Sequence, residues 1–456
     1  MAWPAGPAGS STAPPIRRVS ALDLMQLSTD AGAVPNQVGA VLVLDAGDGF
    51  DPARVVALLG RRIEGIPRLR QRLHRVPVGC GRPIWVDDPR FDVAWHVTVV
   101  EASGHGEDAA LLDLAAARVT TALPMSRPLW SATLVTGLTG ARVALIVVFH
   151  HVLADGLGGL AVLAHLLDAP FEAASTEAFP QPPPTRRQLR ADAGRTRLAA
   201  LHRLPSGLRQ VRAAARELSS GRMERAPRTS LNRPTGAHRR LALVSTDLAA
   251  VRDLAHEQDA TVNDVVLTAV TGALRRYLRG RQEQLDEVVV SVPIAPTAGG
   301  GADTGNRHGV MPLRLPTGGR PEERLRAIAA TTRARKRGSR GASAAVLAPV
   351  FRLLAALRLL RWCIDHQRMV TTFVTNLPGP REQVTLAGLP VTDLHLVPLA
   401  TGNAAVAFAV VSYAGTLTIT VVADPEHVDA DDLVAALRDE LDHLLPGIAH
   451  REASEV

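Results

Sequence analysis

The chain has little of several residue types and patterns that mark particular classes of protein. Two cysteines, Cys80 and Cys363, are too few for a disulfide framework or a zinc site, and we expect both as free thiols in a reducing compartment. Aromatic residues make up only 3%, so the core must consist of Leu, Val and Ala. No apolar run reaches the ~18–20 residues of a membrane-spanning helix, and the N-terminus does not resemble a secretory signal. These absences predict a cytoplasmic protein that does not cross a membrane.

Acidic residues are fewer than basic ones, 44 against 51, which gives a formal net charge of +7 at pH 7. Nearly all of the positive charge is arginine, because Lys336 is the only lysine. Two explanations stay open: a GC-rich genome, or attraction to anions such as coenzyme phosphates and acidic lipid headgroups. Basic patches with interleaved aromatic residues are missing, so we expect no nucleic-acid partner. The G-x-S-x-G, Walker A and Rossmann glycine patterns are missing too, which disfavours serine hydrolases and nucleotide-binding enzymes.

The length of 456 residues predicts two or three domains. Strands and helices are predicted in mixed order, which favours an α/β protein with mixed sheets. We expect a flexible arm over residues 1–15, a first domain over 16–172, a Pro-rich and basic helical crossover over 173–236, and a second domain over 237–456.

Hydrophobic periodicity predicts the main elements. The predicted strands are Gln37–Leu44, Asp92–Val100, Ser131–Thr136, Val143–His150, Arg239–Ser245, Glu287–Ile294, Val370–Asn376, Ala404–Tyr413 and Thr416–Ala423. The predicted helices are Pro52–Ile66, Glu107–Thr121, Gly156–Leu167, Leu248–Glu257, Val265–Leu278, Glu322–Arg337, Ala342–Ile364 and a last helix that follows Asp429 and ends near Leu445. The apolar segment Ala342–Ile364 is either a core or channel-lining helix or an interfacial helix that dips into lipid.

The heptapeptide HHVLADG, from His150 to Gly156, follows an apolar predicted strand. A histidine at the end of a buried strand is a candidate general base. Successive residues of an extended chain point to opposite sides, so one of His150 and His151 is expected to face the reaction and the other the packing. Without a second ligand cluster, the pair does not indicate a metal site. Asp155 is expected to have a mainly structural role beside Gly156.

Two segments of the second half carry further candidates. Thr261-Val262-Asn263-Asp264 precedes a predicted helix, and Thr261 or Asn263 is expected to cap it. An Asn263 amide near a reaction centre is able to donate a hydrogen bond to a developing oxyanion. Thr375 to Pro380 is expected to form a rigid turn that closes a substrate channel.

The heptapeptide resembles the active-site motif of the CoA-dependent acyltransferase superfamily. Further segments, in order along almost the whole chain, resemble the bacterial wax ester synthase/diacylglycerol acyltransferase family. They are Ser20 to Asp23, Ile66 to Leu73, Phe91-Asp92 with Trp95-His96-Val97, Arg127 to Trp130, Leu231-Asn232, His238 to Arg240, Thr261 to Val266, Gly305 to Arg307, Thr375 to Pro380, and Ser412-Tyr413 through Ala423-Asp424. Singly each segment is weak; jointly they are specific.

The resemblance implies a chloramphenicol-acetyltransferase-like fold, with two α/β domains, mixed sheets and an interdomain tunnel. It implies no bound cofactor, acyl-CoA as co-substrate, and diacylglycerol or a long-chain fatty alcohol as acceptor. It also implies peripheral contact with the inner face of the membrane or with lipid droplets. Two alternatives stay open: a condensation-like enzyme that uses a carrier-protein thioester, and a catalytically silent lipid-binding protein. The intact heptapeptide argues against the silent protein.

The resemblance also implies which residues act. His151 would be the general base, with His150, Asp155 and Gly156 shaping its loop. The implied substrate-binding residues are Asn263, Asp264, Thr375 and Asn376. Asn263, or a backbone N–H, would stabilise the oxyanion, whereas Asp264 is expected to be more structural.

Two departures from the family pattern bear on substrate preference. The family usually shows Met-His before an early Val-Gly, where this chain has Asn36-Gln37. Its usual Pro-Val-Ser-Val-Arg-like segment reads Ser291 to Pro296 here and is followed by a Gly-rich insert.

Overall fold

The computed structural model describes residues 15–30, 32–47, 49–102, 107–153, 156–168, 178–202, 225–294, 309–338, 354, 357, 359–448 and 450–452. Four predictions therefore lie wholly or mostly outside the described residues. They are the arm 1–15, Asp155, the Gly-rich segment around Ala298–Asn306, and most of the apolar segment Ala342–Ile364.

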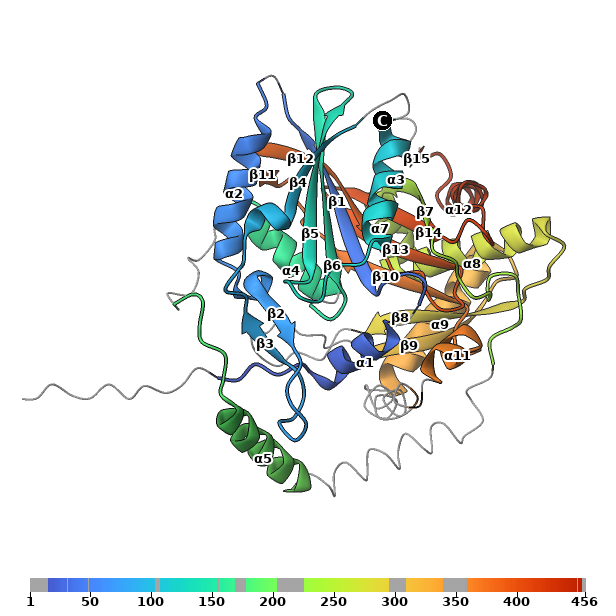
Figure 1. Cartoon of the computed structure of the whole chain (residues 1–456). Helices are drawn as coiled ribbons and strands as arrows, with labels where there is room; N and C mark the ends of the chain where they lie inside the picture. Colours follow the sequence, from blue (N-terminus) through green and yellow to red (C-terminus); the bar gives the residue numbers. More distant parts are fainter. Residues whose placement is uncertain are drawn as a thin grey trace, which may run out of the picture.

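The first sheet has six strands in the order β11-β12-β1-β6-β5-β4 (Figure 1). Their bounds are β1 Gln37–Asp45, β4 Val97–Glu101, β5 Trp130–Leu138, β6 Arg142–His150, β11 Thr385–Leu386 and β12 Leu389–Val397. The pair β4 and β5 is parallel, and the other pairs are antiparallel.

The second sheet has seven strands in the order β15-β7-β14-β13-β10-β8-β9. Their bounds are β7 Arg240–Asp247, β8 Glu287–Ile294, β9 Gly309–Pro316, β10 Thr372–Pro378, β13 Val406–Tyr413, β14 Thr416–Ala423 and β15 Arg451–Glu452. Strand β10 runs parallel to both of its neighbours, β8 and β13. Both sheets are thus mixed, and the predicted two-domain α/β class is confirmed.

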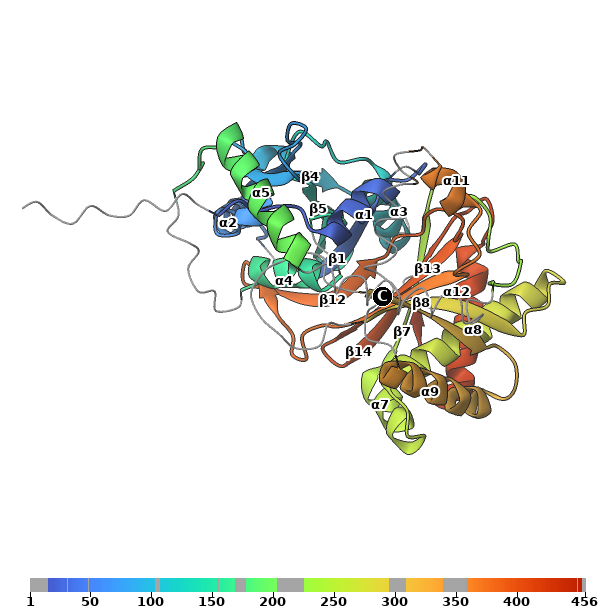
Figure 2. The same ribbon diagram turned by 90° about the horizontal axis from the view of Figure 1, so that it is seen from below.

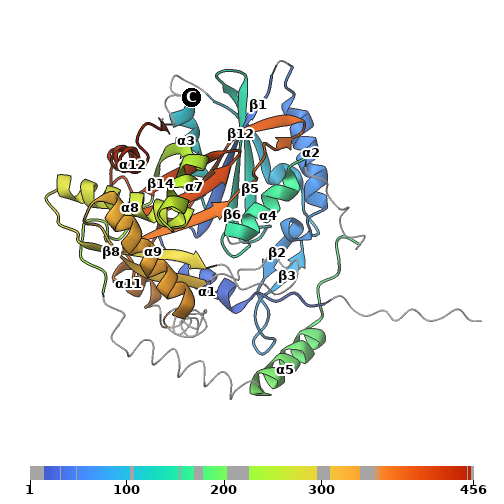
Figure 3. The same ribbon diagram turned by 180° about the vertical axis from the view of Figure 1, so that it is seen from behind.

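Helices pack against both sheets. Their bounds are α1 Ala21–Thr29, α2 Pro52–Glu64, α3 Glu107–Thr120, α4 Gly156–Leu166, α5 Arg186–His202, α7 Leu248–Glu257, α8 Val262–Gly280, α9 Pro321–Gly338, α11 Leu360–Asp365 and α12 Ala430–Leu444. Apolar residues of α2 and α4 share a core with the first sheet, and those of α7, α8, α9 and α12 share another with the second (Figures 2 and 3). Two short 3-10 helices, Pro67–Arg70 and Val93–Trp95, and the hairpin of β2 (Gln71–His74) and β3 (Ile84–Asp87) complete the first half.

A third core lies where the two sheets meet. It joins residues of β1, β5 and β6 to Leu241 and Leu243 of β7, with α3 packed among them. At Gly39 the approach is so close that a Cβ would lie 3.1 Å from the Val147 carbonyl oxygen and 3.3 Å from Val119 of α3. A side chain at this position would therefore push α3 away from β1.

The sheets do not divide the chain at a single point. Strand β12 belongs to the C-terminal half but pairs with β1 of the first sheet, with Val41 opposite His395. The domain boundaries at 16–172 and 237–456 remain predictions. The first sheet contains strands from both ranges.

A latch at Asp168, just after α4, holds the β11–β12 hairpin against the first half. Its carboxylate accepts hydrogen bonds from Thr385 Oγ1 at 2.8 Å and from the backbone N–H groups of Ala387 and Gly388 at 3.0 and 2.6 Å. Arg62 of α2 completes the latch with an ion pair to the same carboxylate. Burial raises the pKa of Asp168, but these hydrogen bonds outweigh burial and lower it to about 2.

One predicted strand is shorter than expected, and six strands escaped prediction: the long strands β9 and β12 and the short strands β2, β3, β11 and β15. Asp92–Val100 was expected to be extended, but Asp92 caps a 3-10 turn by accepting the Ala94 N–H, so the strand begins at Val97. Strand β9 carries prolines, which a sheet tolerates because β9 is an edge strand. The other long strand that was missed is β12.

Candidate active site

Strand β6 ends at His150, and the next residue, His151, already lies in a turn. Every residue from Val143 to His150 is buried, and His150 is 1% exposed. His151 is half-buried, and its backbone N–H donates to the Asn36 carbonyl oxygen at 2.8 Å. His150 is therefore the member of the pair that faces the packing.

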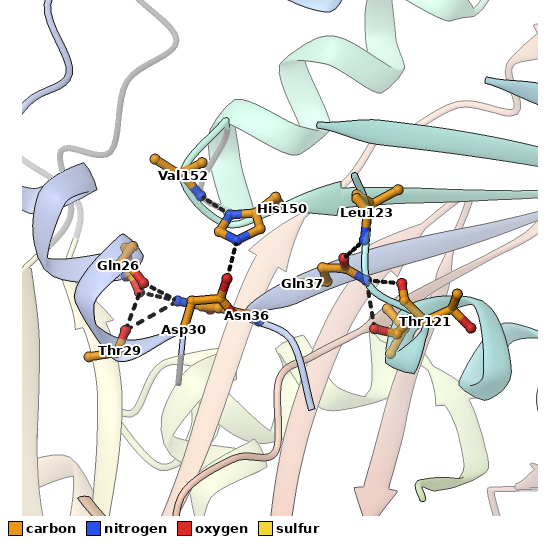
Figure 4. A network of polar contacts seen from close by, with 10 residues as sticks. Gln26, Thr29, Asp30, Asn36, Gln37, Thr121, Leu123, His150 and Val152 are labelled. Carbon is orange, nitrogen blue, oxygen red and sulfur yellow. Dashed lines mark hydrogen bonds and ion pairs between the residues drawn. The ribbon is translucent and has the colours of Figure 1, made fainter. Parts of the chain in front are cut away.

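Both ring nitrogens of His150 have hydrogen-bond partners (Figure 4). Nδ1 accepts the backbone N–H of Val152 at 3.1 Å, and Nε2 lies 3.0 Å from Oδ2 of Asp30. A nitrogen that accepts carries no proton, so the proton of the neutral ring is on Nε2 and points to the carboxylate. His150 is therefore held in one tautomer and one orientation.

Asp30 follows α1 and is joined to the start of β1 as well as to His150. Its Oδ1 accepts the backbone N–H of Asn36 at 2.9 Å. Burial raises the pKa of Asp30, but the hydrogen bonds from His150 and Asn36 outweigh burial and lower it below the usual value. Asp30 is therefore ionised at neutral pH. Sequence reasoning missed Asp30, because its partner is 120 residues away.

Asn36 and Gln37 are the residues that depart from the family pattern, and the side chains of both form hydrogen bonds with the backbone of neighbouring segments. The Asn36 side-chain amide donates to the Gln26 carbonyl oxygen at 3.0 Å, at the end of α1. The Gln37 side-chain amide donates to the carbonyl oxygens of Val119 and Thr121 at 2.9 Å each, and its Oε1 accepts the Leu123 N–H at 2.8 Å. These contacts, most of which are drawn in Figure 4, connect α1, β1 and the end of α3 near His150.

The helix that follows the heptapeptide connects it with the second sheet. Helix α4 begins at Gly156 and contacts β10, the strand that carries Thr375 and Asn376. Both residues are half-buried. They belong to a regular strand that continues to Pro378, so the predicted turn begins later than expected.

At the start of α8, Thr261 is the cap and Asn263 lies in the first turn, which decides between the two capping candidates. Asp264 is 2% exposed, and its Oδ2 accepts from the N–H and the hydroxyl of Thr261 at 2.9 and 2.7 Å. Its Oδ1 accepts from Thr332 of α9 at 2.8 Å. Asn263 is half-buried. The structure thus brings Asn263 and Asp264 onto one helical turn, with the buried Asp264 anchoring it.

Within the described part of the chain, no three His, Cys, Asp or Glu side chains gather as a metal-binding group. No helix among the described residues has the length and apolar character needed to span a membrane.

Two family models match the chain. The wax ester synthase/diacylglycerol acyltransferase catalytic domain matches residues 19–266, and the C-terminal domain of the same family matches residues 304–445. A Mycobacterium tuberculosis protein named as a diacylglycerol O-acyltransferase is 31% identical over 442 residues, which cover 90% of this chain and 92% of that protein. A second, also named as a diacylglycerol O-acyltransferase, is 29% identical over 428 residues, which cover 90% and 91%.

Solved structures resemble the whole fold. The wax ester synthase/diacylglycerol acyltransferase from Marinobacter aquaeolei superimposes with a TM-score of 0.67 at 22% identity and covers 94% of this chain and 98% of its own. The first condensation domain of the CDA synthetase gives a TM-score of 0.61 at 19% identity, covering 97% and 98%. At these identities the likeness supports the two-domain acyltransferase fold.

Proposed function

This chain belongs to the wax ester synthase/diacylglycerol acyltransferase family and is an acyltransferase, and we propose that it moves a fatty acyl group from acyl-CoA to diacylglycerol. Long-chain fatty alcohols are the second proposed acceptor, with wax esters as products. No covalent enzyme intermediate is needed, because donor and acceptor are bound together.

The observation that carries the mechanism is the unequal burial of the histidine pair. Asp30 and Val152 use both ring nitrogens of His150, which argues against His150 as the base. His151, half-buried in the turn that follows, is the proposed general base.

In the proposed reaction, His151 removes the proton from the acceptor hydroxyl as that oxygen attacks the thioester carbonyl carbon. The tetrahedral oxyanion accepts a hydrogen bond from the Asn263 amide or from a backbone N–H. When the carbon–sulfur bond breaks, the CoA thiolate leaves and takes the proton from the His151 imidazolium. The products are an ester and free CoA, and the base returns to its neutral form.

Product analysis tests this proposal. Purified protein is incubated with radiolabelled palmitoyl-CoA and, separately, diolein or hexadecanol, and the lipids are separated by thin-layer chromatography. We expect labelled triacylglycerol and a smaller or equal amount of wax ester. Palmitoyl carrier protein, supplied in parallel, tests the condensation-like alternative. Transfer from the carrier protein but not from CoA would overturn the proposed donor, and no product from either would favour a silent lipid-binding protein.

An apolar acceptor is dissolved in a lipid phase, and we propose that α5 and the β2–β3 hairpin meet an anionic lipid surface. Leu189 and Ala193 of α5 are buried, Leu189 in a small core with Cys80 and Ile84 of the hairpin. The exposed arginines of α5 are Arg186, Arg187, Arg190, Arg195 and Arg197. Val78 at the hairpin tip is fully exposed. Basic side chains beside an exposed apolar tip suit acidic headgroups.

Sedimentation with lipid vesicles tests this surface. We expect the protein to pellet with phosphatidylcholine vesicles that contain phosphatidylglycerol, and to pellet less with pure phosphatidylcholine. The triple variant Arg186→Glu, Arg187→Glu, Arg190→Glu should lose binding, whereas glutamate at Arg252 and Arg279, exposed on the other half, should not. Equal losses in both variants would show that net charge, and not this surface, governs binding.

A further inference from the structure

The turn that follows β6 and contains His151 is held by hydrogen bonds that lead back to one carboxylate, Asp30, at the end of α1. Figure 4 shows Asp30 with His150, Val152 and Asn36. Asp30 binds the His150 ring directly at 3.0 Å. Through that ring it reaches Val152, whose N–H donates to Nδ1 at 3.1 Å. On its other oxygen it binds the N–H of Asn36, and the carbonyl oxygen of Asn36 accepts the N–H of His151 at 2.8 Å. Three successive residues are thus constrained from one side chain.

We propose that Asp30 is a positioning residue for acyl transfer, which acts by fixing the tautomer of His150 and with it the turn that presents His151. The inference depends on the proposed function only in assigning the base to His151. Asp30 itself does not touch the reacting atoms.

The chemistry of the ring explains why a carboxylate is needed. Val152 can donate to Nδ1 only while the ring proton is on Nε2, and a group that only accepts stabilises a proton there. An ionised carboxylate accepts on both oxygens, so Asp30 serves His150 and Asn36 at once. An amide of the same shape has one acceptor oxygen and one donor nitrogen. With Asn at position 30, either His150 or Asn36 would face a donor.

The variant Asp30→Asn therefore tests the proposal with little change in volume. We expect kcat for triacylglycerol formation to fall by roughly 10- to 100-fold, the cost of misplacing a reacting group by about 1 Å, while KM for both substrates changes less than threefold. His151→Ala, assayed in parallel, shows that the assay detects a loss of catalysis. If His151→Ala loses activity but Asp30→Asn keeps a kcat within twofold of the wild type, the proposal is overturned.

Two further variants separate positioning from general stability. In a His150→Gln background, Asp30→Asn should cause a clearly smaller additional loss of kcat than in the wild type, because only the route through Asn36 remains. An equal loss in both backgrounds would show that Asp30 acts by another route and would overturn the proposal. Asp168→Asn is the matched control: its carboxylate also accepts several hydrogen bonds, so this variant should lower thermal stability but leave kcat unchanged.

Nitrogen NMR of protein labelled in histidine gives a readout that needs no substrate. The ring signals that vanish in His150→Gln identify His150. In the wild type they should show a protonated Nε2 and an unprotonated Nδ1, and in Asp30→Asn they should shift toward protonated Nδ1. Unchanged His150 signals in Asp30→Asn would overturn the tautomer assignment. If the wild type forms none of the expected esters, the proposed function fails, and these signals still decide whether Asp30 sets the His150 tautomer.

Discussion

Each half of the molecule presents a pair of adjacent polar residues in which one member is buried and the other is half-buried. In the first half the pair is His150 and His151, and in the second it is Asp264 and Asn263. The buried member is held by hydrogen bonds on both of its polar atoms in each case. The half-buried member is the one to which we assign chemistry. An internal anchor beside an accessible group is therefore a shared design of the two halves.

The two anchors differ in how far apart in the sequence their hydrogen-bonded residues lie. Asp264 is held mainly by Thr261, three residues away, in a capping box that any isolated helix could form. His150 is held by Asp30, 120 residues earlier, across two elements that only the folded chain brings together. The first-half anchor therefore depends on tertiary structure, and the second-half anchor is largely local. We expect substitutions that disturb the His150 anchor to lower activity, and substitutions that disturb the Asp264 anchor to lower stability.

The largest effect is expected at the proposed base, His151. His151→Ala should lower kcat by roughly 10²–10⁴-fold, the usual contribution of a general base, and should leave thermal unfolding almost unchanged. The assay is triacylglycerol formation from palmitoyl-CoA and diolein, with a melting curve as the control. Near-normal turnover would refute the assignment and would remove the contrast between the two histidines.

The next effect is expected at the half-buried member of the second pair. Asn263→Ala should lower kcat by about 10²-fold or less, since a single oxyanion donor contributes up to about 10²–10³-fold and a backbone N–H is the alternative donor. KM should change little, because the oxyanion exists only after attack. A rise in KM at constant kcat would instead assign Asn263 to substrate binding.

The sequence predicts those parts of the site whose contacts join residues close together in the chain, and it misses those whose contacts join distant residues. A helix cap at Thr261 or Asn263 and a strand that ends at His150 are local patterns, and both could be predicted. Asp30 follows an ordinary helix, and no pattern near it indicates a histidine 120 residues away. Asn36 and Gln37 are visible as departures from a family pattern, but their contacts with α1 and α3 are not.

The missed strands have the same cause. The burial of β12 alternates only from Asp393 to Leu396, and no local pattern indicates that this C-terminal segment pairs with β1. In β9, Pro312 hides the strand, and only the edge position in the sheet explains why proline is tolerated there.

The stability that the Asp168 latch contributes should depend on pH. The folded-state pKa of Asp168 is lowered to about 2 from its usual value of 3.8, so the ionised latch adds stability above pH ~4 that is lost as the pH falls toward 2. Urea unfolding of the wild type and Asp168→Asn should differ at pH 5–7 and converge near pH 2. A difference that stays constant over this range would show that the charge of Asp168 contributes nothing to the latch.

The smallest effect is expected at the local anchor, and it gives the sharpest contrast with Asp30. Thr261→Ala removes a helix N-cap and one hydrogen bond to Asp264, which should lower the free energy of unfolding by about 1 kcal/mol. Because Thr332 still holds the other carboxylate oxygen, the turn that bears Asn263 should keep its place and kcat should stay within twofold. Thr261→Ser, which preserves the cap, is the matched control for urea unfolding and turnover. If Thr261→Ala lost kcat as strongly as Asp30→Asn, the local anchor would also position a reacting group, and the two halves would be equivalent after all.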